Sequence, residues 1–469
     1  MKDPYHLFIG GYGGCIYTLV FTPPSEGGKA SLTETRRPSG GELGSTVVQS
    51  AGVAPTWLTL SSDLAHLCPL CTDPYVRRPC ADAPVPTPLC RRPIATIFPP
   101  ILDLNALHRS SSILDATDEW NEPEGQLTAY KVDSQTLSLE RLSTVSTEGM
   151  WPCHSSLLEH THPKKFISTN YKGRSIVVHQ VKEDGDFEIE MEAVVHSLEG
   201  RGTPGPHSWR QTQQHPHEAH VHPKGKVLVV PDLGTPSSEF GVLMPRTGTD
   251  DLRIYLISPA GTLTHHLDVA LKPCSGPRHV AFSPPSISHS TLYVSNELSN
   301  SVSVFRVTYA TEDFSTPSFE LLQDSISTLP DAPKGTQSSF ERWHASELKV
   351  HPSGKWLYIA NRAEDHNPLN GTKEGENDSI ALFPIDVETG KIDPKRIKWI
   401  DSGGRAPRHF AFSSESKRKS KGVERDLWVA VALHDSDEVV LSRVKEEDGM
   451  WEEVVRLDGL GRPGIALWV

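Results

Sequence analysis

The stretch Gly276-Pro-Arg-His-Val-Ala-Phe-Ser-Pro284 is followed by Leu292-Tyr-Val-Ser-Asn296 and Ser301-Val-Ser-Val-Phe305, giving three strand-like segments in close succession. Polar and apolar residues alternate with period two in His279–Ser283, which is typical of a half-buried β-strand. The Pro, Ser and Asn residues between the segments are turn formers. We therefore expect an antiparallel meander, which a fourth strand would complete.

The second of these segments recurs along the whole chain. Equivalent apolar runs begin at Leu7, Leu67, Phe166, Leu228, Leu292, Leu357 and Leu427. Their starting positions differ by 60, 99, 62, 64, 65 and 70 residues, so the period is nearly constant and is broken once. The break contains the Pro-rich residues 72–125, which we interpret as an insertion within the second repeat.

Seven four-stranded antiparallel units in one chain are best packed radially, because this arrangement leaves only short, protected strand edges. We therefore predict an all-β fold, a single seven-bladed β-propeller domain over residues 1–469. Each blade buries its faces against its neighbours, so 469 residues need no single large core. The strand-like segment Ile465–Val469 is expected to complete the blade begun at Leu7 and so to close the ring with the N-terminal and C-terminal strands.

The overall charge excludes some partners. The chain carries 46 Lys and Arg against 59 Asp and Glu, a net charge of −13, which disfavours nucleic acid and anionic membranes as ligands. No apolar window is long enough for a membrane span, and residues 7–21 are interrupted by glycines, unlike a secretory signal. With seven cysteines, an odd number, these features predict a cytoplasmic protein. Protein partners are not indicated.

In a propeller, the innermost strands line the central channel, so one position per blade converges there. Aligning the inner-strand segments on their turns brings a set of residues to one depth: Thr56, His154, His217, Arg278, Ser346 and Arg408, followed one residue later by Glu218, His279, Glu347 and His409. Together with Arg201 and Arg210, the arginines exceed what Glu218 and Glu347 can neutralise. This excess in an acidic protein predicts a small anionic substrate, held by bidentate pairing.

Several motifs resemble one known family. Arg210-Gln, His215-Pro-His-Glu-Ala-His220, Gly276-Pro-Arg-His, Leu292-Tyr-Val-Ser-Asn-Glu and His351-Pro-Ser-Gly-Lys-Trp-Leu-Tyr-Ile-Ala-Asn-Arg are similar to segments of the seven-bladed lactonases. That family includes bacterial 6-phosphogluconolactonases and fungal 3-carboxy-cis,cis-muconate lactonizing enzymes. The resemblance covers most of residues 1–70 and 125–469.

The resemblance implies an active site at the mouth of the channel. Carried over by motif, the catalytic residues are His154, Glu218 and Arg278, and the substrate-binding residues are Arg210, Arg201, His217, His344 and Arg408. Lactone hydrolysis is the first expectation: His154 or Glu218 would take a proton from water while arginines hold the anionic groups. Lactone-forming cycloisomerisation fits the same residues, and neither reaction requires a metal or an organic cofactor.

Other interpretations of the same residues are weaker. A four-thiolate zinc site needs four cysteines, and the chain has four close together, Cys68, Cys71, Cys80 and Cys90, but their spacing is irregular. Glu218, His220 and His222 would share one face of a strand, yet hydrogen-bonded histidines are the commoner outcome. A non-catalytic propeller that binds protein partners is the remaining alternative, since fold does not decide function. It would tolerate substitution of Arg278 and Glu218.

Overall fold

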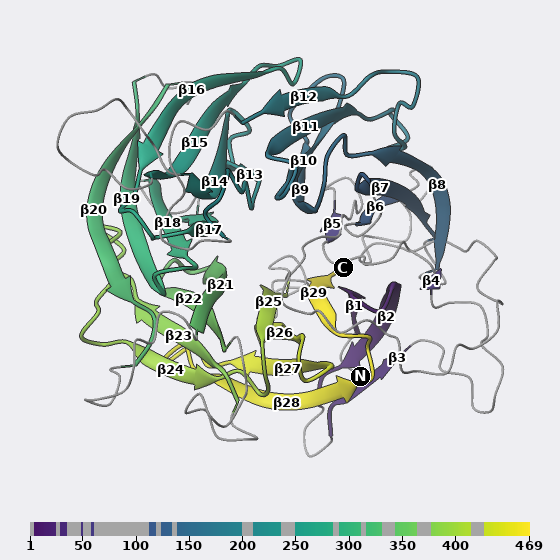
Figure 1. Cartoon of the computed structure of the whole chain (residues 1–469). Coiled ribbons are helices and arrows are strands. Elements are labelled where there is room, and N and C mark those ends of the chain that lie inside the picture. The colour runs from purple at the N-terminus through teal and green to yellow at the C-terminus, as the bar shows by residue number, and fades with distance from the viewer. Residues whose placement is uncertain are drawn as a thin grey trace.

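The computed structural model describes most of the chain as strands and short turns. The described residues are 4–24, 29–34, 48–49, 58–60, 112–118, 123–133, 138–198, 210–235, 249–284, 290–310, 316–330, 343–363, 377–413 and 426–469. In these residues the strands form seven antiparallel sheets arranged around a centre, as Figure 1 shows. The prediction of an all-β propeller is confirmed.

Blades 1 to 3 come first in the ring, and blade 1 contains strands from both ends of the chain. Blade 1 is built of β29 (Pro463–Trp468), β1 (Tyr5–Gly11), β2 (Cys15–Thr22) and β3 (Ser31–Glu34), and β4 (Val48–Gln49) also pairs with β2. Blade 2 contains β5 (Leu58–Leu60), β6 (Ser112–Asp118), β7 (Gln126–Val132) and β8 (Leu139–Ser146). Blade 3 contains β9 (Pro152–Leu158), β10 (Lys165–Asn170), β11 (Ser175–Gln180) and β12 (Val194–Ser197).

The remaining four blades follow in chain order. Blade 4 contains β13 (His220–Val221), β14 (Val227–Thr235), β15 (Thr249–Ile257) and β16 (Leu263–Ala270). Blade 5 contains β17 (Pro277–Phe282), β18 (Ser290–Asn296), β19 (Ser301–Tyr309) and β20 (Pro317–Ser327). Blade 6 contains β21 (Trp343–Val350), β22 (Trp356–Ala363), β23 (Ser379–Pro384) and β24 (Lys398–Asp401). Blade 7 contains β25 (Pro407–Phe412), β26 (Trp428–Leu433), β27 (Glu438–Val444) and β28 (Trp451–Asp458).

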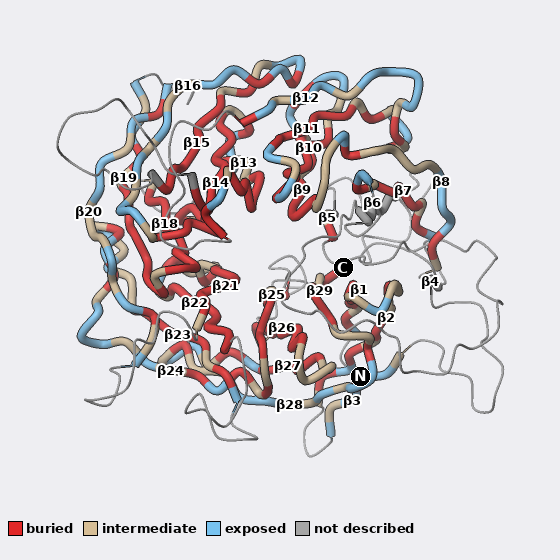
Figure 2. Tube along the Cα trace, in the orientation of Figure 1, coloured by how far each residue is buried: buried red, intermediate tan, exposed pale blue. Residues whose placement is uncertain are grey.

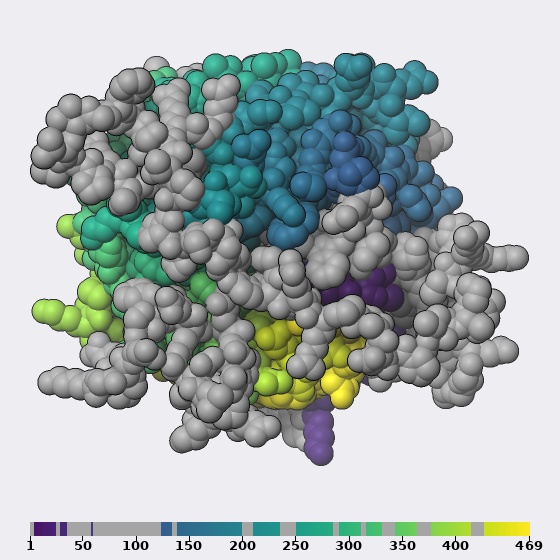
Figure 3. All heavy atoms as spheres, in the orientation of Figure 1, coloured from purple at the N-terminus to yellow at the C-terminus, as the bar shows by residue number. Residues whose placement is uncertain are grey.

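The ring closes through blade 1, whose inner strand comes from the other end of the sequence. β29 pairs antiparallel with β1, with Leu7 opposite Trp468 and Ile9 opposite Ala466. Figure 3 shows the two ends of the chain as neighbouring purple and yellow surfaces. Apolar side chains of blade 1, such as Phe21, pack against blade 7 residues such as Trp428, with ring centroids 4.9 Å apart. The predicted closure is therefore confirmed.

Turn geometry repeats from blade to blade. The residue directly before the third strand has positive φ in four blades, at Gly14, Arg174, Asn300 and Asp437. Gly225 and Gly354 have φ of 67° and 72° and end the turns Pro223-Lys-Gly225 and Pro352-Ser-Gly354. Glycine has no Cβ and adopts this conformation at little cost.

Burial follows the distance from the centre. The first three strands of most blades are largely buried, whereas outer strands such as β16 and β28 alternate or are exposed, as Figure 2 shows. Adjacent blades share apolar clusters; Tyr293 and Val304 of blade 5, for example, pack with Leu357 and Phe383 of blade 6. These inter-blade contacts replace the single core of a compact domain.

Two sequence expectations concern residues that are mostly not described. Residues 61–111, which include Leu67, the four cysteines from Cys68 to Cys90 and most of the predicted insertion over 72–125, lie outside the described residues. Within 72–125, residues 112–118 form β6, the second strand of blade 2. The extent of the insertion stays a prediction.

Candidate active site

Several inner strands carry an irregularity in their pairing with the second strand. In β17, Pro277 pairs with Asn296 and His279 with Ser295, which leaves Arg278 outside the regular ladder. β25 has the same shift between Pro407 and His409, around Arg408. Such bulges bend a strand and redirect a side chain.

The register corrects one predicted equivalence. β9 has its shift between Pro152 and His154, so Cys153 occupies the place of Arg278. His154 is therefore equivalent to His279, one position later than the sequence alignment placed it. Pro152, Pro277 and Pro407 mark the register, because each lies two residues before the histidine of its segment. A bulge adds a residue to one strand only, so the spacing from the next turn does not reveal it.

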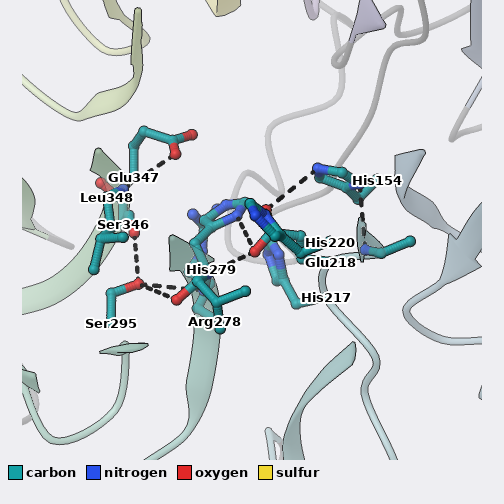
Figure 4. Close-up of polar contacts among 12 residues, drawn as sticks. His154, His217, Glu218, His220, Arg278, His279, Ser295, Ser346, Glu347 and Leu348 are labelled. Atoms are coloured by element: carbon teal, nitrogen blue, oxygen red, sulfur yellow. Dashed lines mark hydrogen bonds and ion pairs between the residues drawn. The ribbon is translucent and has the colours of Figure 1, made fainter. Parts of the chain in front are cut away.

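Five consecutive inner segments bring alternating imidazoles and carboxylates together, and we call this set the histidine–glutamate arc. Its members in chain order are His154, Glu218, His279, Glu347 and His409. Glu218 Oε1 lies 3.6 Å from His154 Nε2, and Glu218 Oε2 lies 3.4 Å from His279 Nδ1. Figure 4 shows His154, Glu218 and His279 converging from three adjacent blades. Glu347 Oε2 lies 3.5 Å from His409 Nε2.

Arc side chains also join neighbouring blades through the backbone. The Ala219 N–H donates to His154 Nδ1 at 3.3 Å, and the Val280 N–H donates to Glu218 Oε2 at 2.6 Å. Likewise the Ala466 N–H, on the closing strand β29, donates to His409 Nδ1 at 3.4 Å. An imidazole that accepts at Nδ1 carries its proton on Nε2 and is neutral.

Electrostatics place both predicted proton-transfer residues in their basic form at neutral pH. Burial lowers the pKa of His154 to about 3, although Glu218 opposes the shift. Burial alone would raise the pKa of Glu218, but the adjacent His220 and His279 hold it well below its usual range. His220 Nδ1 lies 3.0 Å from Glu218 Oε1. Glu218 is therefore a carboxylate, with imidazoles on three sides.

A second buried carboxylate, Glu297, binds arginines instead. Arg278 Nε lies 2.9 Å from Glu297 Oε2, Arg362 Nη2 lies 3.0 Å from Glu297 Oε1, and Arg210 Nη1 also contacts Oε1. We call these four residues the arginine cluster. Burial would raise the pKa of Glu297, but the three guanidiniums hold it well below its usual range. Glu297 is thus ionised at neutral pH.

His217 and His344 adjoin this cluster. The His217 ring centroid lies 5.0 Å from that of His279, and burial and then Arg278 hold the pKa of His217 well below its usual value. His344 Nδ1 lies 3.4 Å from the Glu297 carbonyl oxygen. The arginine cluster and the histidine–glutamate arc are therefore adjacent and meet at His217.

Of the other predicted residues, Arg408 is buried with its guanidinium 5.5 Å from the Tyr12 ring centroid, and it lowers the pKa of His217 together with stronger causes. Arg201 and Thr56 lie outside the described residues.

Comparison with known proteins identifies the family. A family model described as "Lactonase, 7-bladed beta-propeller" matches residues 106–468. The chain belongs to this lactonase family. It is 28% identical over 341 residues to a probable 6-phosphogluconolactonase of Arthroderma benhamiae, covering 73% of both chains. It is 27% identical over 308 residues to a 6-phosphogluconolactonase of Bacillus subtilis, covering 66% of this chain and 72% of that one.

Solved structures of similar shape support the fold of this lactonase-family chain. A periplasmic gluconolactonase of Pseudomonas aeruginosa matches with a TM-score of 0.65 and 21% identity, covering 100% of this chain and 99% of that one. A putative 6-phosphogluconolactonase from Bacteroides fragilis matches with a TM-score of 0.64 and 19% identity, covering 100% and 98%. At these identities the likeness concerns the fold alone.

Sequence reasoning missed two residues of this site, Glu297 and Arg362. It expected Glu218 and Glu347 to neutralise the arginines, but the described contacts pair Glu218 with histidines and Glu347 with His409 and with Lys349 Nζ at 3.0 Å. A signal was present: Glu297 and Arg362 each follow the second-strand Asn directly, in Val-Ser-Asn-Glu and Ile-Ala-Asn-Arg.

In the described residues, no group of His, Cys, Asp or Glu has an arrangement that could hold a metal ion. His222 does not join Glu218 and His220: its Nδ1 accepts the Lys224 N–H at 3.1 Å, and its ring lies against Phe282.

The described part of this lactonase-family chain contains no helix that is long and apolar enough to cross a bilayer.

Proposed function

We propose that this lactonase-family protein hydrolyses a small anionic lactone, of the 6-phosphogluconolactone type, near the centre of the propeller. The observation that carries the proposal is the adjacency of an ionised carboxylate, Glu218, and a buried cluster of guanidiniums around Arg278. Glu218 is suited to deprotonate water and the arginines to hold an anion. The names of the curated relatives support the same substrate class.

In this mechanism Arg278, with Arg210, binds the anionic group of the substrate. Arg201, Arg408, His217 and His344 remain proposed substrate contacts. Glu218 takes a proton from water, and the resulting hydroxide attacks the carbonyl carbon. The ring C–O bond then breaks, the proton passes to the departing alkoxide, and the product is a hydroxy acid.

His154 has a positioning role in this scheme. As a neutral imidazole protonated on Nε2, it faces Glu218 Oε1 at 3.6 Å while the Ala219 N–H fixes its other nitrogen. It orients the carboxylate that receives the proton. The scheme as written uses no metal and no organic cofactor.

Lactone-forming cycloisomerisation places a different demand on these groups, because a proton must be delivered to carbon. His154 and Glu218 both have lowered pKa values and hold no acidic proton at neutral pH. This difference favours hydrolysis, in which the same groups act first as bases.

The test incubates purified protein with 6-phosphogluconolactone and, separately, with 3-carboxy-cis,cis-muconate. We expect acid release from the first at a rate above the spontaneous one and no enzymatic change in the ultraviolet absorbance of the second. Turnover of the muconate alone would assign the cycloisomerase reaction. Turnover of neither would reject both reactions and favour an interaction scaffold.

A further inference from the structure

Glu297 joins three blades at one point. It directly follows β18 of blade 5 and is 2% exposed. Its carboxylate contacts Arg278 from β17, Arg362 from β22 of blade 6, and Arg210, which precedes β13 of blade 4. A single carboxylate therefore fixes three guanidiniums that the chain supplies from distant segments.

We propose that Glu297 is a positioning residue that holds Arg210, Arg278 and Arg362 as a subsite for a phosphate dianion, and thereby sets a preference for phosphorylated over unphosphorylated lactones. This inference rests on the proposed lactonase function. It adds to that function the part of the substrate that is recognised, and it assigns roles to Glu297 and Arg362.

The charges of the cluster match such a ligand. Three guanidiniums converge on the one carboxylate of Glu297, and a phosphate monoester, whose charge approaches −2 at neutral pH, is a strongly anionic ligand for such a cluster. Guanidiniums present forked N–H donors that pair with phosphate oxygens in bidentate fashion. An unphosphorylated lactone lacks an anionic group that could pair with these guanidiniums.

Arg278 supplies an independent observation. Its side chain is buried, and its Nη1 has no hydrogen-bond acceptor within the described segments of the chain. Buried donors in folded proteins nearly always have an acceptor. A substrate oxygen at Nη1 would satisfy this donor, while Nε remains 2.9 Å from Glu297 Oε2.

Glu297 makes this arrangement possible, because three guanidiniums brought together repel one another unless an anion lies between them. In the free protein the carboxylate keeps the three arms in place. Its loss would let the arginines spread and would weaken phosphate recognition more than the reaction at the lactone carbonyl.

The experiment measures kcat and KM for 6-phosphogluconolactone and for glucono-δ-lactone with the wild-type protein, Glu297→Gln and Glu297→Asp. In Glu297→Gln we expect kcat/KM for the phosphorylated lactone to fall about 30-fold or more, mainly through KM, and that for the unphosphorylated lactone to change less than about threefold. Glu297→Asp keeps the charge and should recover part of the preference. An unchanged preference in Glu297→Gln would overturn the inference.

Asp232→Asn is the matched control. Asp232 is also a fully buried carboxylate, and it accepts from Arg253 Nε and Nη2 at 2.9 and 2.7 Å, outside both groups of the candidate site. We expect this variant to lower the unfolding temperature without changing the ratio of the two kcat/KM values. A ratio that falls equally in both variants would assign Glu297 a purely structural role and contradict the proposal.

Two further measurements keep the outcome decisive. If Glu297→Gln does not fold, Arg362→Met removes one arm and should raise the KM for the phosphorylated lactone about tenfold with little change for the other; an unchanged KM would overturn the inference. If the wild-type protein hydrolyses neither lactone, the proposed function fails. Calorimetric titration with inorganic phosphate then tests the subsite, which requires binding that Glu297→Gln or Arg362→Met weakens; equal or absent binding would reject it.

Discussion

Glu218 and Glu297 are both almost fully buried, yet their neighbours differ in kind. Imidazoles of His154, His220 and His279 surround Glu218, whereas guanidiniums surround Glu297. Imidazoles change charge near physiological pH, but a guanidinium stays charged throughout. The same side chain thus lies once beside imidazoles and once beside groups of permanent positive charge.

In the proposed function, this difference separates the residue that takes part in the reaction from the residue that supports substrate binding. Glu218 contacts three imidazoles, and the proposed mechanism uses it as the base. Glu297 is held among three guanidiniums of permanent charge, and in the proposal it acts as a fixed structural anion. The predictions below test whether the two positions have these separate roles.

The largest effect is expected from Glu218→Gln. Removing the proposed base should lower kcat/KM by at least about 100-fold for both phosphorylated and unphosphorylated lactones, since the lost step is common to them. Steady-state kinetics with circular dichroism and thermal melts measure activity and folding in parallel.

Glu347→Gln is the matched control for Glu218→Gln, because Glu347 is equally buried in the same arc but contacts Lys349 and His409. It should keep turnover within about fivefold. Full turnover in Glu218→Gln, or an equal loss in both variants, would contradict the proton-transfer role of Glu218.

Arg278→Ala should lower kcat/KM for the phosphorylated lactone about 100-fold. The variant removes the guanidinium whose Nε contacts Glu297 and should raise KM. Arg278→Lys should restore only part of the loss, because an ammonium lacks the forked donors. The comparison weakens if lysine restores wild-type KM, since charge alone would then suffice.

Lowering the pH should reduce the stability of the folded protein through the buried histidines, whereas the arginines stay charged and do not contribute. Burial lowers the pKa of His154 and His409 to about 3, so both remain neutral in the folded state below the ordinary value of 6.5. The unfolded chain binds more protons between pH 6.5 and about 3, and stability therefore falls as the pH drops through this window. Each such histidine adds a slope of at most about 1.4 kcal/mol per pH unit.

Denaturant unfolding at pH 7, 6 and 5 measures that slope. His409→Gln should reduce it, because one titrating group is removed while an amide oxygen can still accept the Ala466 N–H. An unaltered slope in this variant would show that His409 does not carry the linkage. Arg362→Met is the control, because loss of this guanidinium should leave the pH dependence of stability between pH 7 and 5 unchanged.

The smallest effect is expected from His220→Asn. The His220 side chain is 27% exposed and helps to lower the pKa of Glu218. Its removal should shift the acidic limb of the pH profile of kcat/KM upward, with a change at neutral pH of less than about tenfold. An unshifted limb would indicate that other groups determine the basicity of Glu218.

Much of the architecture was predictable because it repeats. The apolar runs near Leu228, Leu292 and Leu357 become β14, β18 and β22, and the segment from Ile465 to the C-terminus closes the ring as expected. Local period and turn chemistry determine these features, so the chain itself displays them.

The site was only partly predictable. His154, Glu218 and Arg278 were found by comparing inner segments, but a bulge shifts His154 by one place in the register. Glu297 and Arg362 directly follow the second-strand Asn, a position outside the inner segments whose comparison predicted the site. The carboxylate that an arginine contacts depends on how neighbouring blades are placed. This is a tertiary property, and the spacing of residues within one segment does not reveal it.

The pairing of β29 with β1 also has a consequence for biogenesis. Strands β1 to β3 are translated before the other six blades, but their innermost neighbour β29 is translated after all of these blades. One edge of blade 1 therefore stays unpaired until residue 468 has been synthesised. The other six blades can pack against each other before that. Strands that are made before the other blades are thus the last to gain all of their final neighbours.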